Sequence, residues 1–204
     1  MENILVTGAT GEYGKAVIEN LLNKGVNSNS VYALVRDDLK AEYLKSLDIN
    51  IVIGDYNNYE SLIKAFNGID KLLFVSSGEI YNRIEQHLNV IKAAKKTRIK
   101  HIIYTSQIHK TTNSNSPMSF VMESHIMTEN ALVESDIHFT ILRNGLYLDM
   151  LPLFLGKEVI EKGVFLPAGE GKIAFALRSE MAEAAANILT SEFHENKIYK
   201  ITRF

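Results

Sequence analysis

The stretch NILVTGATGEYG, residues 3–14, decides the fold. Its first five residues are typical of a short buried strand, and an apolar-periodic helix is predicted over about 15–22. Between them, Gly8 permits a tight turn, Gly11 lets the backbone approach a pyrophosphate, and Gly14 lets the helix pack close to the strand. The helix N-terminus offers unpaired N–H groups to phosphates. Three glycines in seven residues also occur in ordinary turns, but the strand–turn–helix context favours a dinucleotide-binding fingerprint.

Composition limits the class of protein. The 204 residues, 46% hydrophobic and 23% charged, fit one globular domain or two small ones. A net charge of -2 gives no electrostatic reason to expect nucleic acid or an anionic membrane surface as a partner. The absence of cysteine excludes disulfides and thiolate chemistry, and the six histidines lack the spacing of a metal site. Since the chain shows neither a signal peptide nor a run of ~20 apolar residues, we expect a cytoplasmic protein.

Strand-like and helix-like segments alternate along the chain, which favours an α/β fold with a parallel sheet covered on both faces. After the first strand we predict strands at 31–35, 51–53, 71–75, 101–104, 138–142 and 197–202. Helices are predicted at 59–66, 81–96, 117–134, 151–162 and 179–189, with Pro117 as the first residue of one and Ser179 as the cap of another. Right-handed crossovers give a doubly wound Rossmann sheet with strand order near 3-2-1-4-5-6. We assign 1–150 to the dinucleotide-binding domain, and 151–204 to a small substrate lobe plus a final helix and strand packed on the same domain.

Ligands of such sheets bind beyond the carboxyl ends of the strands. Arg36, at the end of the second predicted strand, is the most informative residue there. NAD sites usually carry an acidic residue at this place, whereas a guanidinium suits bidentate contact with a 2′-phosphate. We therefore predict NADP(H) rather than NAD. The alternative is a solvated arginine beside Asp37 and Asp38, whose carboxylates would also weaken phosphate affinity.

Six segments resemble those of the NmrA-like atypical short-chain dehydrogenases, closest to the NADPH-dependent quinone oxidoreductase type: TGATGEYG, the VR ending strand two, GDY, VSSGE, YTS and LRNGLY. The resemblance spans essentially the whole chain and implies the positions of the cofactor-binding residues. The adenosine diphosphate end would be held by Gly8, Ala9, Thr10, Gly11, Glu12, Tyr13 and Arg36. Asp55 would lie near the adenine, with Ser76, Ser77 and Gly78 beneath the ribose, and Tyr104 belongs to the same set. Near the nicotinamide we expect Asn144, Gly145 and Tyr147.

The helix after the fifth strand departs from ordinary short-chain dehydrogenases. It lacks their Tyr-x-x-x-Lys pair and carries His125 and Glu129 four residues apart on one face. A carboxylate there would raise the histidine pKa and make His125 a candidate proton donor, as Tyr147 is also; a packed, hydrogen-bonded histidine is the reading we favour. Ser106 stands where a catalytic serine would be, and His87 is expected to be a hydrogen-bonded core residue. A quinone needs little help from such groups, because solvent can protonate its reduced oxygens, so proximity and orientation suffice.

We therefore expect an NADPH-dependent oxidoreductase that reduces a small-molecule acceptor such as a quinone by direct hydride transfer without flavin. The alternative is a nicotinamide-nucleotide sensor that binds cofactor and a partner protein without turnover, as regulators of the resembled group do. The resembled enzymes carry a further segment after the last strand that supplies much of the substrate lobe, whereas this sequence stops at Phe204. Three explanations stay open: a smaller lobe over 151–171, a second subunit that covers the site in a homodimer, or a truncated form with reduced activity.

Overall fold

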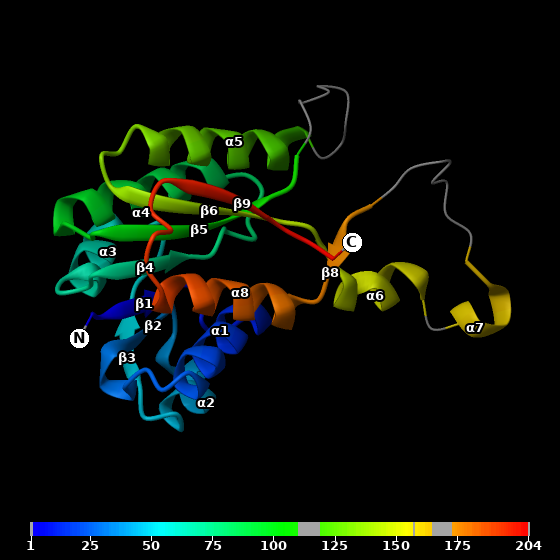
Figure 1. Cartoon of the computed structure of the whole chain (residues 1–204), viewed down its shortest axis with the longest axis horizontal. Helices are drawn as coiled ribbons and strands as arrows, with labels where there is room; N and C mark the ends of the chain where they lie inside the picture. Colours follow the sequence, from blue (N-terminus) through cyan, green and yellow to red (C-terminus); the bar gives the residue numbers. More distant parts are fainter. Residues whose placement is uncertain (1, 110–118, 157, 165–172, 204) are drawn as a thin grey trace.

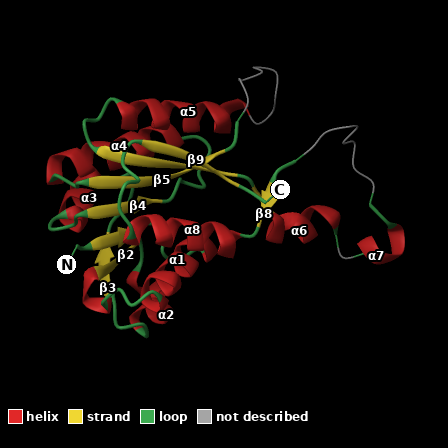
Figure 2. Cartoon of the chain, viewed as in Figure 1, coloured by secondary structure: helices red, strands yellow, loops and turns green. Residues whose placement is uncertain are grey.

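A seven-stranded parallel sheet forms the centre of the molecule (Figures 1 and 2). The computed structural model describes residues 2–109, 119–156, 158–164 and 173–203. The strand order is β3-β2-β1-β4-β5-β6-β9, which confirms the predicted doubly wound sheet and adds the last strand beside β6. The strands are β1 (Ile4–Val6), β2 (Val31–Val35), β3 (Asn50–Ile53), β4 (Lys71–Phe74), β5 (His101–Gln107), β6 (His138–Asn144) and β9 (Lys197–Ile201).

Helices cover both faces of this sheet (Figure 1). One face carries α1 (Glu12–Asn23) and α8 (Arg178–Thr190), and the other carries α3 (Tyr59–Phe66), α4 (Arg83–Thr97) and α5 (Ser119–Val133). The alternation of β1 shows how one strand supplies both cores: Ile4 and Val6 join the cluster under α1 and α8, whereas Leu5 joins the cluster under α3 and α4. A strand buried on both faces reads as an unbroken apolar run, which is the pattern that predicted it.

The remaining elements are short. They are η1 (Ser28–Ser30), η2 (Asp38–Ala41), α2 (Glu42–Lys45), β7 (Leu146–Tyr147), η3 (Leu148–Met150), α6 (Leu151–Leu155), α7 (Val159–Lys162) and β8 (Phe175–Ala176). β7 and β8 form a separate two-stranded parallel sheet, and α6 and α7 extend away from the main sheet beyond it (Figure 1). None of the helices in the described part of the chain is long and apolar enough to cross a membrane.

Two predictions about the helices were wrong, and a third concerns a residue outside the described part of the chain. The helix predicted over 151–162 is divided into α6 and α7, because Gly156 adopts φ +76 and ends α6. Ser179 does not cap α8: Leu177 occupies the N-cap position, and its N–H donates to Glu180 Oε2 at 3.2 Å. Pro117 falls outside the described residues.

Candidate nucleotide-binding site

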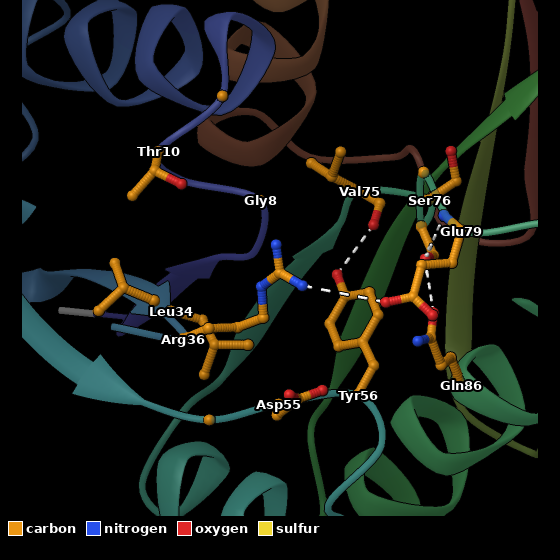
Figure 3. A pocket seen from close by; sticks show the side chains of 15 residues that line it. Gly8, Thr10, Leu34, Arg36, Asp55, Tyr56, Val75, Ser76, Glu79 and Gln86 are labelled. Atoms are coloured by element: carbon orange, nitrogen blue, oxygen red, sulfur yellow. Dashed lines mark hydrogen bonds and ion pairs between the residues drawn. The ribbon is translucent and has the colours of Figure 1, made fainter. Parts of the chain in front are cut away.

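A cavity of about 390 Å³ opens at the carboxyl ends of the central strands (Figure 3). Its walls come from the turns that follow β1, β2, β3 and β4, which is the switch point where doubly wound sheets bind their ligands. It is lined by Gly8, Thr10, Gly11, Leu34, Val35, Arg36, Gly54, Asp55, Tyr56, Val75, Ser76, Ser77, Gly78, Glu79 and Gln86.

The glycine turn between β1 and α1 is shaped by close backbone contacts. Gly8 has φ +59, and a Cβ added at Gly14 would lie 2.4 Å from the Gly8 carbonyl oxygen. No side chain among the described residues caps α1, whose N-cap residue is Gly11, and Gly11 itself lines the cavity. Such a helix start attracts phosphate oxygens.

Thr7 and Tyr56 join the turns around this cavity. The Thr7 hydroxyl donates to the Leu73 carbonyl at 3.1 Å and accepts from the Val75 N–H at 2.9 Å. The Tyr56 hydroxyl lies 2.5 Å from Thr7 Oγ1. It also lies 2.8 Å from the Val75 carbonyl oxygen (Figure 3). Thr7 follows β1, Val75 follows β4 and Tyr56 follows β3. These bonds therefore hold the turns after the three strands in one fixed arrangement.

Arg36 extends from the end of β2 into the mouth of the cavity (Figure 3). Its side chain is 74% exposed, and the nearest ion-pair partner is Glu79, with Nη1 and Oε1 4.0 Å apart. Asp37 is engaged elsewhere, since its Oδ1 accepts from the Leu39 N–H at 3.0 Å, and Asp38 pairs with Lys45 at 2.5 Å. The carboxylate that meets Arg36 is therefore Glu79, on another crossover, and not either of its neighbours in sequence.

The predicted cofactor residues divide into two groups. Of these, Gly8, Thr10, Gly11, Arg36, Asp55, Ser76, Ser77 and Gly78 line the cavity, whereas Ala9, Glu12, Tyr13, Tyr104, Asn144, Gly145 and Tyr147 are outside its lining. Tyr13 is buried between α1 and α8, where its hydroxyl lies 3.3 Å from the Met181 carbonyl oxygen. Sequence reasoning missed Tyr56, Glu79 and Gln86. Tyr56 and Glu79 stand in the GDY and VSSGE segments directly after two strands, so their position was a usable signal.

The segment after β6 forms a second group of polar residues. Asn144 is 3% exposed, and neither its Nδ2 nor its Oδ1 has a hydrogen-bond partner among the described residues. Gly145 fits tightly, because an added Cβ would lie 2.5 Å from the Ala174 carbonyl oxygen. Burial raises the pKa of the Tyr147 phenol, so this group stays protonated, and the Arg178 guanidinium lies 5.5 Å from the centre of its ring. The Asn144 amide is thus buried, and it lies beside the Tyr13 and Tyr147 phenols.

His125 does not pair with Glu129, which corrects the predicted rise of its pKa. Its Nε2 lies 2.9 Å from Arg83 Nη2 and its Nδ1 lies 2.8 Å from the Tyr104 hydroxyl. Burial and the Arg83 charge lower the pKa of His125 to about 3, although Glu129 acts in the opposite direction. Because a guanidinium only donates, Nε2 must accept, and His125 is a neutral, packed residue rather than a proton donor.

Glu129 belongs to a different cluster. Its carboxylate accepts from the Ser106 hydroxyl at 2.5 Å and from Arg143 through Nε at 3.1 Å and Nη2 at 2.6 Å. Burial raises the pKa of Glu129, but these hydrogen bonds outweigh it and hold the pKa below its ordinary value. Ser106 is thus engaged as a donor to this ion pair. Within the described ranges, no group of three His, Asp or Glu side chains could hold a metal ion.

A known protein family matches almost the whole chain. Residues 1–201 match the family model described as "NmrA-like family". The chain belongs to the NmrA-like family. It is 42% identical to "Quinone oxidoreductase 2" of Escherichia coli over 97% of its own length and 68% of the relative's. It is also 31% identical to "NAD(P)H azoreductase" of Xenophilus azovorans over 98% of its length and 67% of the relative's.

Solved structures match almost the whole of this chain. The NADPH complex of the Escherichia coli NADPH-dependent quinone oxidoreductase matches with a TM-score of 0.88 and 41% identity, over 98% of this chain and 69% of that one. The NADP(H) complex of Citrobacter sp. triphenylmethane reductase matches with a TM-score of 0.87 and 39% identity, over 98% and 70%. The chain therefore spans about two thirds of the length of these relatives.

Proposed function

We propose that this protein is an NADPH-dependent oxidoreductase that reduces quinones by direct hydride transfer, without flavin. The observation that carries the proposal is the cavity at the switch point, in which an uncapped helix start and the Arg36 guanidinium converge from two different strands. The similarity to a quinone oxidoreductase and to structures crystallised with NADP(H) supports the same choice of cofactor and acceptor.

The residues present fit the adenosine end of NADPH. The turn from Gly8 to Gly11 and the first N–H groups of α1 would hold the pyrophosphate, because the backbone there is unobstructed by side chains. Arg36 would bind the 2′-phosphate through its guanidinium. Asp55 and the serine turn, residues 76–78, form the remaining wall, where the adenine and ribose would lie.

The nicotinamide end would extend toward the segment after β6. Its carboxamide, or the acceptor's carbonyl group, would meet the Asn144 amide, whose donor and acceptor atoms are both unpartnered among the described residues. Burying such an amide without partners is costly, so a ligand that supplies both a donor and an acceptor would be bound favourably. Tyr147, protonated beside it, would present a hydroxyl to the same ligand.

Hydride transfer to a quinone needs little acid–base help from protein side chains. When bound, NADPH supplies the hydride, and the acceptor gains two electrons and one proton from it as hydride plus one further proton from solvent. His125 is neutral and hydrogen-bonded on both nitrogens, so it serves as a packed support rather than an acid. The protein would then accelerate the reaction by holding NADPH and the quinone close together in the orientation that hydride transfer needs.

A direct assay tests this function. NADPH and a simple benzoquinone are mixed with the protein, and the loss of reduced-nicotinamide absorbance is followed against a control without protein. We expect turnover that requires both substrates. Tight NADPH binding without turnover across several quinones would sink the enzyme proposal and leave the sensor as the function, whereas equal turnover with NADH would contradict the choice of NADPH.

A further inference from the structure

Ser77, on the wall of the cavity, is held on all three of its polar groups by one face of α4. Its N–H donates to His87 Nε2 at 2.9 Å, and its hydroxyl donates to Gln86 Oε1 at 2.5 Å. Its carbonyl oxygen accepts from Arg83 Nη1. Residues at i, i+3 and i+4 share a helix face, so Arg83, Gln86 and His87 converge on a single residue from the start of α4. We call these three residues the α4 clamp.

The residues of the α4 clamp also form hydrogen bonds to other elements of the fold. Gln86 Nε2 donates to Asn57 Oδ1 at 3.1 Å, which ties it to the turn after β3. His87 Nδ1 lies 2.7 Å from Thr128 Oγ1 on α5. Because His87 Nε2 accepts from Ser77, its proton must be on Nδ1, and this nitrogen donates to Thr128. The clamp residues are 7%, 2% and 0% exposed, so these bonds are shielded from water and hold one geometry.

Arg83 brings a buried positive charge that no carboxylate neutralises among the described residues. Its Nη2 contacts the neutral His125, its Nη1 contacts the Ser77 carbonyl, and its Nε has no partner. Glu129, one turn beyond His125, is already paired with Arg143. Burying an unpaired cation destabilises a fold. Such a charge behind the cavity wall would favour an anion in the cavity, and the phosphates of a dinucleotide would be one.

We propose that Arg83 is a positioning residue for the cofactor: it fixes the Ser77 carbonyl, and with it the serine turn, in the conformation that receives the cofactor ribose, and its charge favours the anionic ligand. Gln86 has the same task through the Ser77 hydroxyl and without a charge. This inference rests on the proposed binding of NADPH but not on quinone turnover.

The test compares Arg83→Met, which keeps the length but removes charge and hydrogen bonds, with Arg83→Lys, which keeps the charge. Gln86→Met removes the bonds to Ser77 and Asn57 at constant charge. Arg98→Met, at the exposed opposite end of α4, is the matched control. NADPH Kd is measured by fluorescence titration, beside the melting temperature Tm and the quinone kcat and KM. We expect the Kd to rise about tenfold in Arg83→Met, less in Arg83→Lys, and not at all in the control.

The outcomes separate positioning from a merely structural role. A lower Tm with an unchanged Kd in Arg83→Met would overturn the proposal, as would an equal rise of Kd in Arg98→Met. If Arg83→Met does not fold, Arg83→Lys and Gln86→Met decide, and parental Kd values in both overturn it. If the unsubstituted protein binds NADPH but does not reduce quinones, the proposed enzymatic function is wrong and the proposed role of Arg83 is unaffected. If the unsubstituted protein binds no NADPH, both proposals are wrong.

Discussion

The Arg36 guanidinium and the Glu79 carboxylate face each other across the mouth of the cavity, with Nη1 and Oε1 4.0 Å apart (Figure 3). Arg36 directly follows β2 and Glu79 follows β4, so the pair bridges two crossovers on opposite sides of β1. Both side chains are well exposed, at 74% and 46%, and such a pair contributes little to folding. Its importance is for the ligand, because a 2′-phosphate bound to Arg36 would also meet the negative charge of Glu79.

Replacing Arg36 with alanine should weaken NADPH binding much more than NADH binding. A charge-assisted bidentate contact with the 2′-phosphate predicts a rise in NADPH Kd of about tenfold or more. NADH lacks that phosphate, so its Kd should change little. Titration of both nucleotides measures the difference. Equal losses for the two would refute the assignment of Arg36 to the 2′-phosphate.

The Glu79→Gln variant should bind NADPH more tightly, because it removes a carboxylate that repels the 2′-phosphate and competes for Arg36. For exposed charges we expect a gain of about two- to fivefold, with NADH unchanged. Glu85→Gln, an exposed change on α4 with the same effect on net charge, is the control. An equal gain in Glu85→Gln would assign the effect to overall charge instead of to the Arg36 contact.

Replacing His125 with asparagine should leave the pH profile of quinone reduction unchanged between about pH 6 and 8. The reason is that His125 is already neutral there, its pKa being lowered to about 3, so it has no proton to donate in this range. The measurement is kcat/KM against pH for both proteins. A parental inflection that disappears in His125→Asn would restore the histidine as a proton donor.

The Gly14→Ala variant should lose stability and NADPH affinity together. Its new Cβ would lie 2.4 Å from the Gly8 carbonyl oxygen and 2.8 Å from the Ala9 Cα, both backbone atoms of the turn. Forcing such an overlap costs about 1–3 kcal/mol and shifts the turn that would hold the pyrophosphate. Urea unfolding and NADPH titration measure the two effects, and Asn23→Ala at the exposed end of α1 is the control. An unchanged free energy of unfolding would contradict the close approach.

Buried neutral histidines should make the fold sensitive to acid. Burial and the Arg83 charge lower the pKa of His87 to about 2, against about 6.5 in the unfolded chain. The unfolded state therefore binds more protons below about pH 6.5, and stability falls as the pH drops, by up to about 1.4 kcal/mol per pH unit for this residue. Urea midpoints at pH 7 and 5 should differ less in His87→Gln than in the parent. His138→Gln, at an exposed position, should keep the parental difference.

Local patterns were sufficient to predict the architecture. The strand order followed from the alternation of strands and helices joined by right-handed crossovers. The glycine turn and the position of Arg36 followed from turn chemistry and from the residue type at the end of a strand. The helix break at Gly156 and the extension of β5 to Gln107 were missed, because the first depends on one backbone angle and the second on pairing with β6.

What the sequence by itself determined is the parallel sheet, its switch point and the kind of residues that gather there. Only the tertiary structure decided which side chains meet. It paired Arg36 with Glu79 rather than with Asp37, turned His125 toward Arg83 rather than toward Glu129, and brought the α4 clamp onto Ser77. The physical reason is that each of these contacts joins different elements, and its geometry follows from how helices dock on the sheet, which no spacing within a single segment encodes.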